Sequence, residues 1–197
     1  MQTAGRFERQ GGLSMSTLTI DLFSSLDGFA AAEDWPGYWG KEGPELMAWL
    51  EEELAEDHIV VMGANTYRTM SQIVAEEEDP TFARMAEIPK VVFSKTLKPP
   101  LTWANTQVVA EGAVTALRRM KEEGSVPMRT MGSISLNKSL LREGLVDTLQ
   151  LVVFPVVTGQ TGLQPIFADW PDLDLELVKS RTFDGRMQLL RYVPTLH

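Results

Sequence analysis

The sequence predicts an α/β fold in three layers, with a mostly parallel sheet between helices and an antiparallel hairpin at the C-terminus. Short β-type runs alternate with helical ones over the first two thirds of the chain, an order typical of parallel sheets covered by helices. The last third changes character, because two long strand-like runs flank Asp184-Gly185, a strong hairpin signal. The 197 residues and the 44% hydrophobic content fit one globular domain.

The first fourteen residues are expected to lie outside the fold. Segment 1–14 has no periodicity, contains a Gly-Gly pair and lacks the apolar central region of a signal peptide. We interpret it as a leader or an expression remnant, and we expect a single domain over residues 15–197.

The first strand and the first helix are predicted from side-chain periodicity. Leu18, Ile20 and Leu22 alternate with polar residues, which is typical of a strand, and a long loop follows. Pro44 suits the first position of a helix. The apolar positions of this helix recur at spacing four: Leu46, Leu50 and Leu54. Its acidic residues are expected to face solvent: Glu51, Glu52, Glu53 and Glu56.

Further strands and helices follow in alternation. His58–Met62 is apolar nearly throughout, as in a strand buried on both faces. Other strands are expected at Lys90–Ser94, Gln107–Ala110, Met128–Met131 and Thr148–Phe154. Helices are expected after Gly63, around Val114 to Met120, and from Gly132-Ser133 to Gly144. The hairpin pairs Leu175–Thr182 with Met187–Val193.

Composition excludes several kinds of function. The net charge of -9 and the lack of a basic patch disfavour nucleic acid and anionic membranes as partners. The chain has no cysteine, so thiolate-zinc sites, disulfides and cysteine nucleophiles are excluded. Its imidazoles are His58 and His197, too few and too far apart to suggest a Ser-His-Asp triad or a multi-histidine metal site. No apolar stretch approaches the roughly 20 residues that cross a bilayer. We therefore expect a small-molecule ligand, no metal and a cytoplasmic location.

Three strand-to-helix or strand-to-loop junctions are candidates for binding a phosphate-bearing ligand. In parallel sheets ligands bind beyond the carboxyl ends of the strands, where free backbone N–H groups at helix starts favour anions. A glycine at one such junction is usually structural, but three junctions together are a stronger signal. No G-x-G-x-x-G or P-loop signature occurs. The junctions are Gly63-Ala64-Asn65-Thr66, Ser94-Lys95-Thr96 and Gly132-Ser133-Ile134-Ser135.

The chain resembles the dihydrofolate reductase-like superfamily. It is most similar to the C-terminal reductase domain of the bifunctional riboflavin-biosynthesis deaminase-reductase and to the stand-alone relatives of that domain. The resemblance runs in order from about Ser16 to Val193. Six segments carry it: Ser25–Gly28 (SLDG), Val60–Tyr67 (VVMGANTY), Val91–Leu97 (VVFSKTL), Met131–Leu141, Gly144–Gly159 and Phe183–Tyr192.

The resemblance implies NADPH bound across the strand ends and hydride transfer to a small heterocyclic or carbonyl substrate. By position, the residues along the cofactor phosphates are Gly63, Ala64 and Thr66. Those near the adenosine ribose and its 2′-phosphate are Ser94, Lys95 and Thr96. Those that hold the pyrophosphate are Gly132, Ser133, Ile134 and Ser135. Relatives commonly carry Arg where this chain has Ala64, and Lys95 supplies charge without a bidentate fork, so NADH is also considered.

The proton donor does not follow from the resemblance. The first helix carries Leu46 and Met47 where dihydrofolate reductase places a carboxylate. Asp27 is the remaining acid that we expect at the cleft, as the catalytic residue and as a substrate contact with Gly28 and Trp39. The alternatives are an Asp-Gly turn for Asp27 and core packing for Trp39.

Two hypotheses on function follow. The first is an NADPH-dependent reductase similar to 5-amino-6-(5-phosphoribosylamino)uracil reductase. The second is a non-catalytic nucleotide- or ligand-binding relative that kept the cleft and lost the chemistry. We also expect a homodimer through the apolar run Leu151–Val157, with burial of this run inside one subunit as the alternative.

Overall fold

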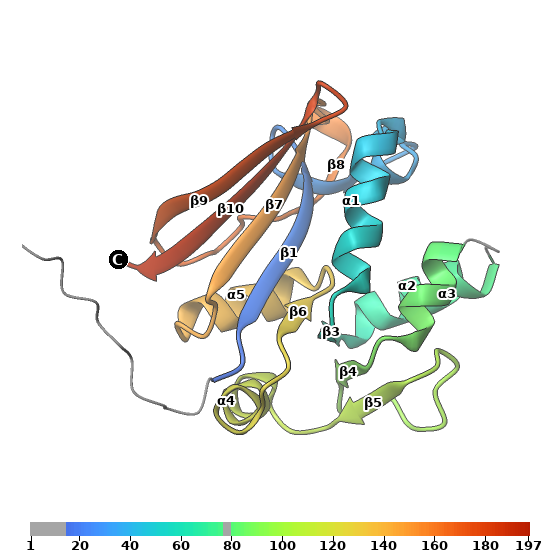
Figure 1. Cartoon of the computed structure of the whole chain (residues 1–197), viewed down its shortest axis with the longest axis vertical. Coiled ribbons are helices and arrows are strands. Elements are labelled where there is room, and N and C mark those ends of the chain that lie inside the picture. The colour runs from blue at the N-terminus through green and yellow to red at the C-terminus, as the bar shows by residue number, and fades with distance from the viewer. Residues whose placement is uncertain (1–14, 77–79) are drawn as a thin grey trace, which may run out of the picture.

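An eight-stranded sheet runs through the centre of the computed structural model, which describes residues 15–76 and 80–197 (Figure 1). Its strands are β1 (Leu18–Ser25), β3 (Ile59–Gly63), β4 (Lys90–Phe93), β5 (Thr106–Val109), β6 (Met128–Thr130), β7 (Thr148–Phe154), β9 (Leu173–Phe183) and β10 (Met187–Leu196). They lie in the order β5-β4-β3-β6-β1-β7-β10-β9. The six strands from β5 to β7 in this order are parallel, and β10 and β9 are antiparallel to their neighbours.

Five helices, two short strands and two 3-10 segments complete the elements of the described residues. The helices are α1 (Pro44–Ala55), α2 (Ala64–Glu76), α3 (Pro80–Glu87), α4 (Ala113–Glu123) and α5 (Ile134–Arg142). Two short strands, β2 (Phe29–Ala32) and β8 (Gly162–Pro165), form a separate antiparallel pair. The 3-10 segments are η1 (Gly37–Gly40) and η2 (Gly159–Thr161). The expectation for residues 1–14 lies outside the described residues.

Helices cover both faces of the sheet, which confirms the predicted three-layer α/β fold. Side chains alternate between the faces along each strand, so neighbours on β3 belong to different clusters. Val61 packs in the cluster of α4 and α5, whereas Val60 and Met62 pack with α2 and α3. Helix α1 packs over β7 and β10 on the same face as α2, through Leu46 and Trp49. Trp49 is thus a core residue.

The C-terminal hairpin turn also caps α1. Asp184 and Gly185 both have positive φ, as the predicted tight turn requires. The Asp184 carboxylate accepts hydrogen bonds from the backbone N–H groups of Glu45 (3.0 Å) and Leu46 (3.2 Å). The Glu45 carboxylate in turn accepts the N–H of Asp184. The hairpin turn therefore satisfies two of the backbone donors that α1 leaves free at its N-terminus, although the turn and the helix are far apart in the sequence.

The structure corrects one assignment and adds elements that the sequence pattern does not predict. Glu53 was expected on the solvent side of α1, but its side chain is only 17% exposed and forms ion pairs with Arg129 and Arg191. Helix α3 and the β2–β8 pair have no counterpart in the predicted order. No helix within the described ranges is long and apolar enough to span a membrane.

Candidate functional site

The three predicted junctions lie along one edge of the sheet. Strands β4, β3 and β6 are parallel neighbours, so their carboxyl ends point the same way. Ser94 follows β4, Gly63 ends β3 and is followed at once by α2, and Gly132-Ser133 lies between β6 and α5. Residues 30 to 70 positions apart in the sequence are brought together here, as parallel strand order requires.

Ser133 joins two of these junctions directly. Its Oγ accepts a hydrogen bond from the Gly63 backbone N–H at 2.8 Å and lies 2.8 Å from the Thr66 hydroxyl. The Gly132 carbonyl accepts a bond from the Asn137 amide, whose residue is fully buried. Gly132 and Ser133 both adopt left-handed φ values, +52° and +62°. Such a value is uncommon for a serine, and here the bonds of the Ser133 hydroxyl hold it.

This edge carries backbone donors of the kind that bind anions in proteins. Helices α2 and α5 both begin here, at Ala64 and Ile134, and each leaves backbone N–H donors at a positive dipole end. Two side-chain-free residues lie between them. A Cβ on Gly63 would be 3.6 Å from the Ser133 Oγ, and one on Gly132 would be 3.5 Å from the Thr66 methyl, so side chains there would fill the space between the two turns. Ser135, the second residue of α5, is exposed at the same end.

The third junction offers a cation rather than a hydroxyl. The Ser94 Oγ accepts the backbone N–H groups of Thr96 (3.1 Å) and Leu97 (3.0 Å), so Ser94 shapes its own turn. Lys95 and Thr96 are exposed. Lys95 forms no ion pair with any residue that the structure describes, which leaves its ammonium group available to an anion.

Asp27 holds a neighbouring loop in place. Its two carboxylate oxygens accept the backbone N–H groups of Thr158 (3.1 Å) and Gly159 (2.8 Å). Desolvation alone would raise the pKa of Asp27, but hydrogen bonds from Ser25, Gly159 and Thr158 together lower it to about 2. A carboxyl with this pKa is ionised at neutral pH and has no proton to donate. Its hydrogen bonds go to the distant loop at Thr158 and Gly159 and favour a structural role over proton transfer, although not within the Asp-Gly turn that was the alternative.

Gly28 and Trp39 serve packing. Gly28 has φ +87°, and a Cβ there would lie 3.2 Å from the ring of Phe167. Trp39 is 5% exposed, and its ring centroid lies 5.1 Å from that of Phe154 in the core. Core packing thus accounts for most of the Trp39 surface.

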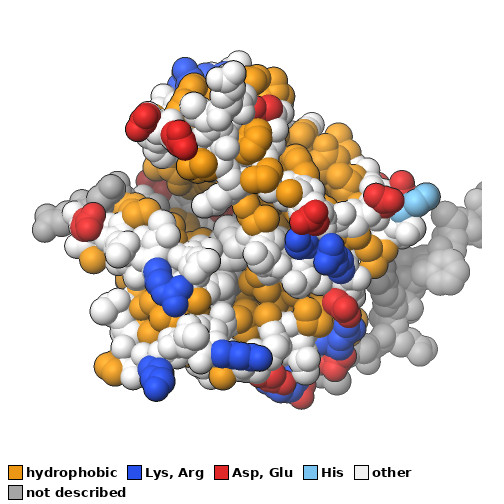
Figure 2. All heavy atoms as spheres, turned by 180° about the vertical axis from the view of Figure 1, so that it is seen from behind, with side chains coloured by type: hydrophobic (Ala, Val, Ile, Leu, Met, Phe, Trp, Pro, Cys, Tyr) orange, Lys and Arg blue, Asp and Glu red, His pale blue; other side chains and the backbone are white. Residues whose placement is uncertain are grey.

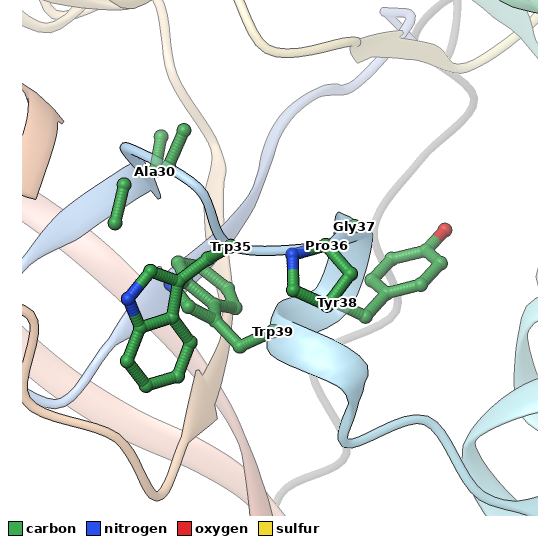
Figure 3. Close-up of a pocket in the computed structure, with 8 residues that line it drawn as sticks. Ala30, Trp35, Pro36, Gly37, Tyr38 and Trp39 are labelled. Carbon is green, nitrogen blue, oxygen red and sulfur yellow. The ribbon is translucent and has the colours of Figure 1, made fainter.

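Trp39 also borders a pocket in the loop before α1. This pocket has a volume of about 210 Å³ and is lined by residues of β2 and η1 (Figure 3). Tyr38 and Trp39 both have positive φ, which is uncommon for bulky residues. Figure 3 shows the Trp35 ring beside the Trp39 ring, with the Tyr38 ring pointing the other way. The residues that line the pocket are Ala30, Ala31, Ala32, Trp35, Pro36, Gly37, Tyr38 and Trp39.

A row of polar side chains lies beneath α1, and sequence reasoning missed it. Asp21 on β1 is the register partner of Gln150 on β7, which is the partner of Arg191 on β10. The Arg191 guanidinium donates to the Gln150 side-chain oxygen, with Nε at 2.8 Å. Glu53 on α1 forms ion pairs with Arg191 (3.4 Å) and, from the other side, with Arg129 on β6. The row therefore crosses four neighbouring strands under one helix.

Asp21 has the most perturbed environment in this row. Burial raises its pKa to about 6, and the Glu53 carboxylate adds to this effect, although the Arg129 guanidinium and Gln150 oppose it. Its Oδ1 is buried and has no hydrogen-bond partner among the described residues. Its backbone N–H donates to the Thr130 hydroxyl of β6, two residues before Gly132. One signal in the sequence could have revealed Asp21: it is a carboxylate inside a strand of a predicted parallel sheet. Helices cover both faces of such a sheet, so the carboxylate had to be buried.

The described residues show neither a cluster of metal ligands nor, on the face in Figure 2, a basic patch. The part of the chain that the structure describes contains no group of three His, Cys, Asp or Glu placed to hold a metal ion. Figure 2 shows one face hollowed below its upper lobe, with basic side chains scattered among acidic ones rather than gathered in one patch.

Comparison with known proteins places this architecture in a family. The model of the RibD C-terminal domain family matches residues 16–189. An uncharacterized protein of Bacillus subtilis strain 168, YyaP, is 23% identical over 189 residues, which cover 91% of this chain and 96% of YyaP.

Solved structures share the fold at low sequence identity. A Shewanella sp. PV-4 protein assigned to riboflavin biosynthesis is 19% identical with a TM-score of 0.67, covering 91% of this chain and 99% of that one. The Thermotoga maritima diaminohydroxyphosphoribosylaminopyrimidine deaminase/5-amino-6-(5-phosphoribosylamino)uracil reductase is 16% identical with a TM-score of 0.62. The match covers 92% of this chain and 57% of that enzyme. Because the family model spans most of the sequence, this chain belongs to the RibD C-terminal domain family.

Proposed function

We propose that this protein is a reductase that uses NADPH to reduce a small heterocyclic or carbonyl compound in the cytoplasm. The observation that carries the proposal is the Ser133 hydroxyl, which ties the start of α2 to the start of α5 through Gly63 and Thr66. The two helix N-termini thereby present donors to one anion at the carboxyl edge of the sheet. The reductase activities of family members support the same conclusion.

Different residues at this edge bind different parts of the cofactor. Residues 132–135 and the start of α2, with Ala64 and Thr66, hold the pyrophosphate by backbone donors. The Gly63 N–H is already bonded to Ser133, so Gly63 contributes by leaving room for the phosphates. The Lys95 ammonium attracts the 2′-phosphate that distinguishes NADPH from NADH, with Ser94 and Thr96 shaping its turn. When bound, the nicotinamide supplies the hydride.

Asp21 is our candidate for the accompanying proton. Hydride transfer to a polar double bond leaves a negative charge that a proton neutralises, and an acid with a pKa near the working pH delivers it best. Burial holds the pKa of Asp21 at about 6, whereas hydrogen bonds hold that of Asp27 at about 2. Asp21 also lies one strand away from the segment that leads into Gly132. Asp27 then positions the loop at Thr158 and does not transfer a proton.

Titration with NADPH tests the proposal. Nicotinamide fluorescence should shift on addition of protein, and NADH should bind more weakly than NADPH because it lacks the charge that Lys95 attracts. Lys95→Ala should remove the difference between the two cofactors and leave NADH affinity unchanged. Absence of binding at millimolar NADPH would refute the proposal.

A panel of pterins, pyrimidines and quinones tests turnover. Asp21→Asn should lower the turnover number and flatten the pH profile near pH 6, while Asp27→Asn should preserve the shape of that profile. Equal profiles for Asp21→Asn and the wild type would remove Asp21 from the mechanism.

One observation favours a non-catalytic binding protein as the second candidate. Helix α1 presents no acid in its first turns toward the sheet: Leu46 is fully buried there and packs in the core. NADPH binding without oxidation across the whole panel would select this candidate.

A further inference from the structure

The pocket between β2 and the loop before α1 lies beyond the carboxyl end of β1. The chain leaves β1 at Ser25, turns at Asp27-Gly28 and enters β2 at Phe29. Strand β1 carries Asp21 and is parallel to β6, which leads into Gly132-Ser133. The pocket therefore belongs to the same edge of the sheet as the three junctions, the edge at which parallel sheets bind their ligands.

Small residues leave the space of this pocket, and aromatic rings enclose it. Three consecutive alanines of β2 line one side, and the rings of Trp35 and Trp39 line another (Figure 3). Trp35 is 41% exposed, so part of its ring is open to a ligand. The volume of about 210 Å³ is below the range of about 300 to 1,000 Å³ that is typical of pockets for drug-sized ligands. The pocket therefore suits a small ring system.

The aromatic wall is fixed before any ligand arrives. The ring centroids of Tyr38 and Trp39 lie 6.0 Å and 5.1 Å from that of Phe154, at the end of β7. The Trp39 backbone N–H donates to the Pro36 carbonyl at 3.0 Å. A left-handed backbone at two consecutive bulky residues persists only where the surroundings hold it, and these contacts do so. Binding therefore does not require this wall to become ordered.

The charges around the pocket disfavour an anionic ligand. Of the described residues that line it, none is charged. Glu33 and Asp34 directly precede Trp35, and both are exposed. Segment 33–42 contains one further acid, Glu42, and a single basic residue, Lys41. A phosphate group carries a charge of about -1.5 to -2 at neutral pH, so it would meet repulsion here and no guanidinium fork to neutralise it.

We propose that this pocket is the substrate site of the reductase and that it takes a flat, uncharged ring system without a phosphate group, stacked on Trp35. The name of the Thermotoga maritima enzyme gives it a substrate with a phosphoribosyl group. The substrate of this chain differs from that compound in lacking the phosphate. As a substrate site the pocket rests on the proposed function, whereas ring binding by itself does not.

Two probes that differ only in a phosphate group test the proposal. Uridine and uridine 5′-monophosphate are titrated into the full chain in the absence of cofactor, and heat of binding is measured by calorimetry. Uridine should bind, and the monophosphate should bind at least tenfold more weakly, because its charge meets Glu33 and Asp34. Equal or tighter binding of the monophosphate would overturn the proposal, as would absence of uridine binding.

A charge variant identifies the source of this discrimination. Glu33→Gln/Asp34→Asn removes two negative charges, and asparagine tolerates the left-handed φ of +58° at position 34. The variant should bind the monophosphate at least threefold more tightly than the wild type does and should bind uridine equally well. The matched control is Glu51→Gln/Glu52→Gln, which removes the same charge from exposed positions in the second half of α1. A control that improves monophosphate binding as much would show that net charge, not this pocket, discriminates.

A ring deletion tests stacking on Trp35. Trp35→Ala should raise the uridine dissociation constant about tenfold, within the usual range for loss of one ring that stacks on a base. Phe167→Ala is the control, because that ring is 48% exposed and does not line the pocket. Circular dichroism should show both variants folded. Equal uridine affinities for the two variants would overturn the role of Trp35.

Separate measurement of NADPH affinity distinguishes failure of this proposal from failure of the proposed function. NADPH binding without uridine binding would refute the ring site and leave the reductase. Uridine binding that discriminates against phosphate, without any NADPH binding, would refute the reductase and leave a site for uncharged rings.

Discussion

Asp21 and Gln150 are direct register partners in β1 and β7, yet the Oδ1 of Asp21 and the Nε2 of Gln150 are both buried and have no hydrogen-bond partner among the residues that the structure describes. A buried polar atom without a partner costs stability. The proton-donor role that we propose for Asp21 gives a reason for keeping this cost in the interior of the protein.

Asp21→Asn is expected to stabilise the protein at neutral pH. The folded pKa of about 6 lies above the ordinary value of 3.8 for an aspartate, so folding disfavours the ionised form. Burying the ionised Asp21 carboxylate lowers the free energy of unfolding. This loss is absent below pH 3.8, grows between pH 4 and 6, and is complete above pH 6. At pH 7.5 the variant should gain about 3 kcal/mol in urea denaturation, from a shift of about two pKa units at the usual value of about 1.4 kcal/mol per unit.

The same variant should show no gain at pH 4. The control is Asp57→Asn, at an exposed position. A gain that is equal at both pH values would show that the effect comes from packing and not from ionisation.

Ser133→Ala should weaken cofactor binding more than it weakens the fold. The variant removes the hydroxyl that both Gly63 and Thr66 contact, so the two helix starts lose their connection. Loss of about 1 to 1.5 kcal/mol, typical of a hydrogen bond, corresponds to a roughly tenfold higher NADPH dissociation constant. Ser139→Ala is the matched control in the same helix, because the Ser139 hydroxyl bonds only the Ser135 carbonyl of its own helix. Equal affinities for the two variants would contradict the bridging role.

Glu53→Gln should destabilise the protein. The variant leaves two guanidinium groups, of Arg129 and Arg191, partly buried without their shared carboxylate. Breaking one partner of a fully buried pair costs about 3 to 5 kcal/mol, and partial exposure reduces this to about 2 kcal/mol. Glu52→Gln, one residue earlier and exposed, should have little effect on the urea midpoint. Similar midpoints for the two variants would show that these ion pairs are not stabilising.

Asp27→Ala should loosen the loop at Thr158 and Gly159. Hydrogen bonds lower the folded pKa of Asp27 to about 2, below the ordinary value of 3.8 for an aspartate. Its stabilising contribution is therefore present above pH 3.8 and is lost as the pH falls toward 2. Hydrogen exchange at the Thr158 and Gly159 amides should speed up in the variant at pH 7. Unchanged protection there, measured beside the exposed control Asp172→Ala, would argue against anchoring.

The sequence predicts the order of strands and helices where periodicity is strong. Strand β7 begins and ends at the predicted residues, and the turn at Asp184-Gly185 is confirmed. Helix α3 was not predicted, since its 8 residues are too few to show a clear helical period.

The polar features of the site depend on contacts between distant segments. An acidic run such as residues 51–56 is typical of a solvated face, and only the packing of α1 over β6 and β10 reveals that Glu53 lies among arginines. In β9, a bulge at Val178 reverses a side-chain alternation that a sequence pattern assumes to be continuous. The three junctions were predictable because each depends on one glycine or one short turn. The Ser133 hydroxyl as the link between two of them was not.

The reactivity of the buried Lys90 amine depends on local unfolding of this protein. The residue is 2% exposed, and its Nζ donates to the carbonyls of Met85 (2.7 Å) and Ile88 (2.6 Å) while lying 4.8 Å from the centre of the Trp103 ring. An amine-reactive reagent reaches exposed lysines such as Lys95 in the native protein, but it reaches Lys90 only when α3 and β4 separate. The acylation rate at this one position therefore measures how often the interior of the domain opens, without any probe having to be introduced.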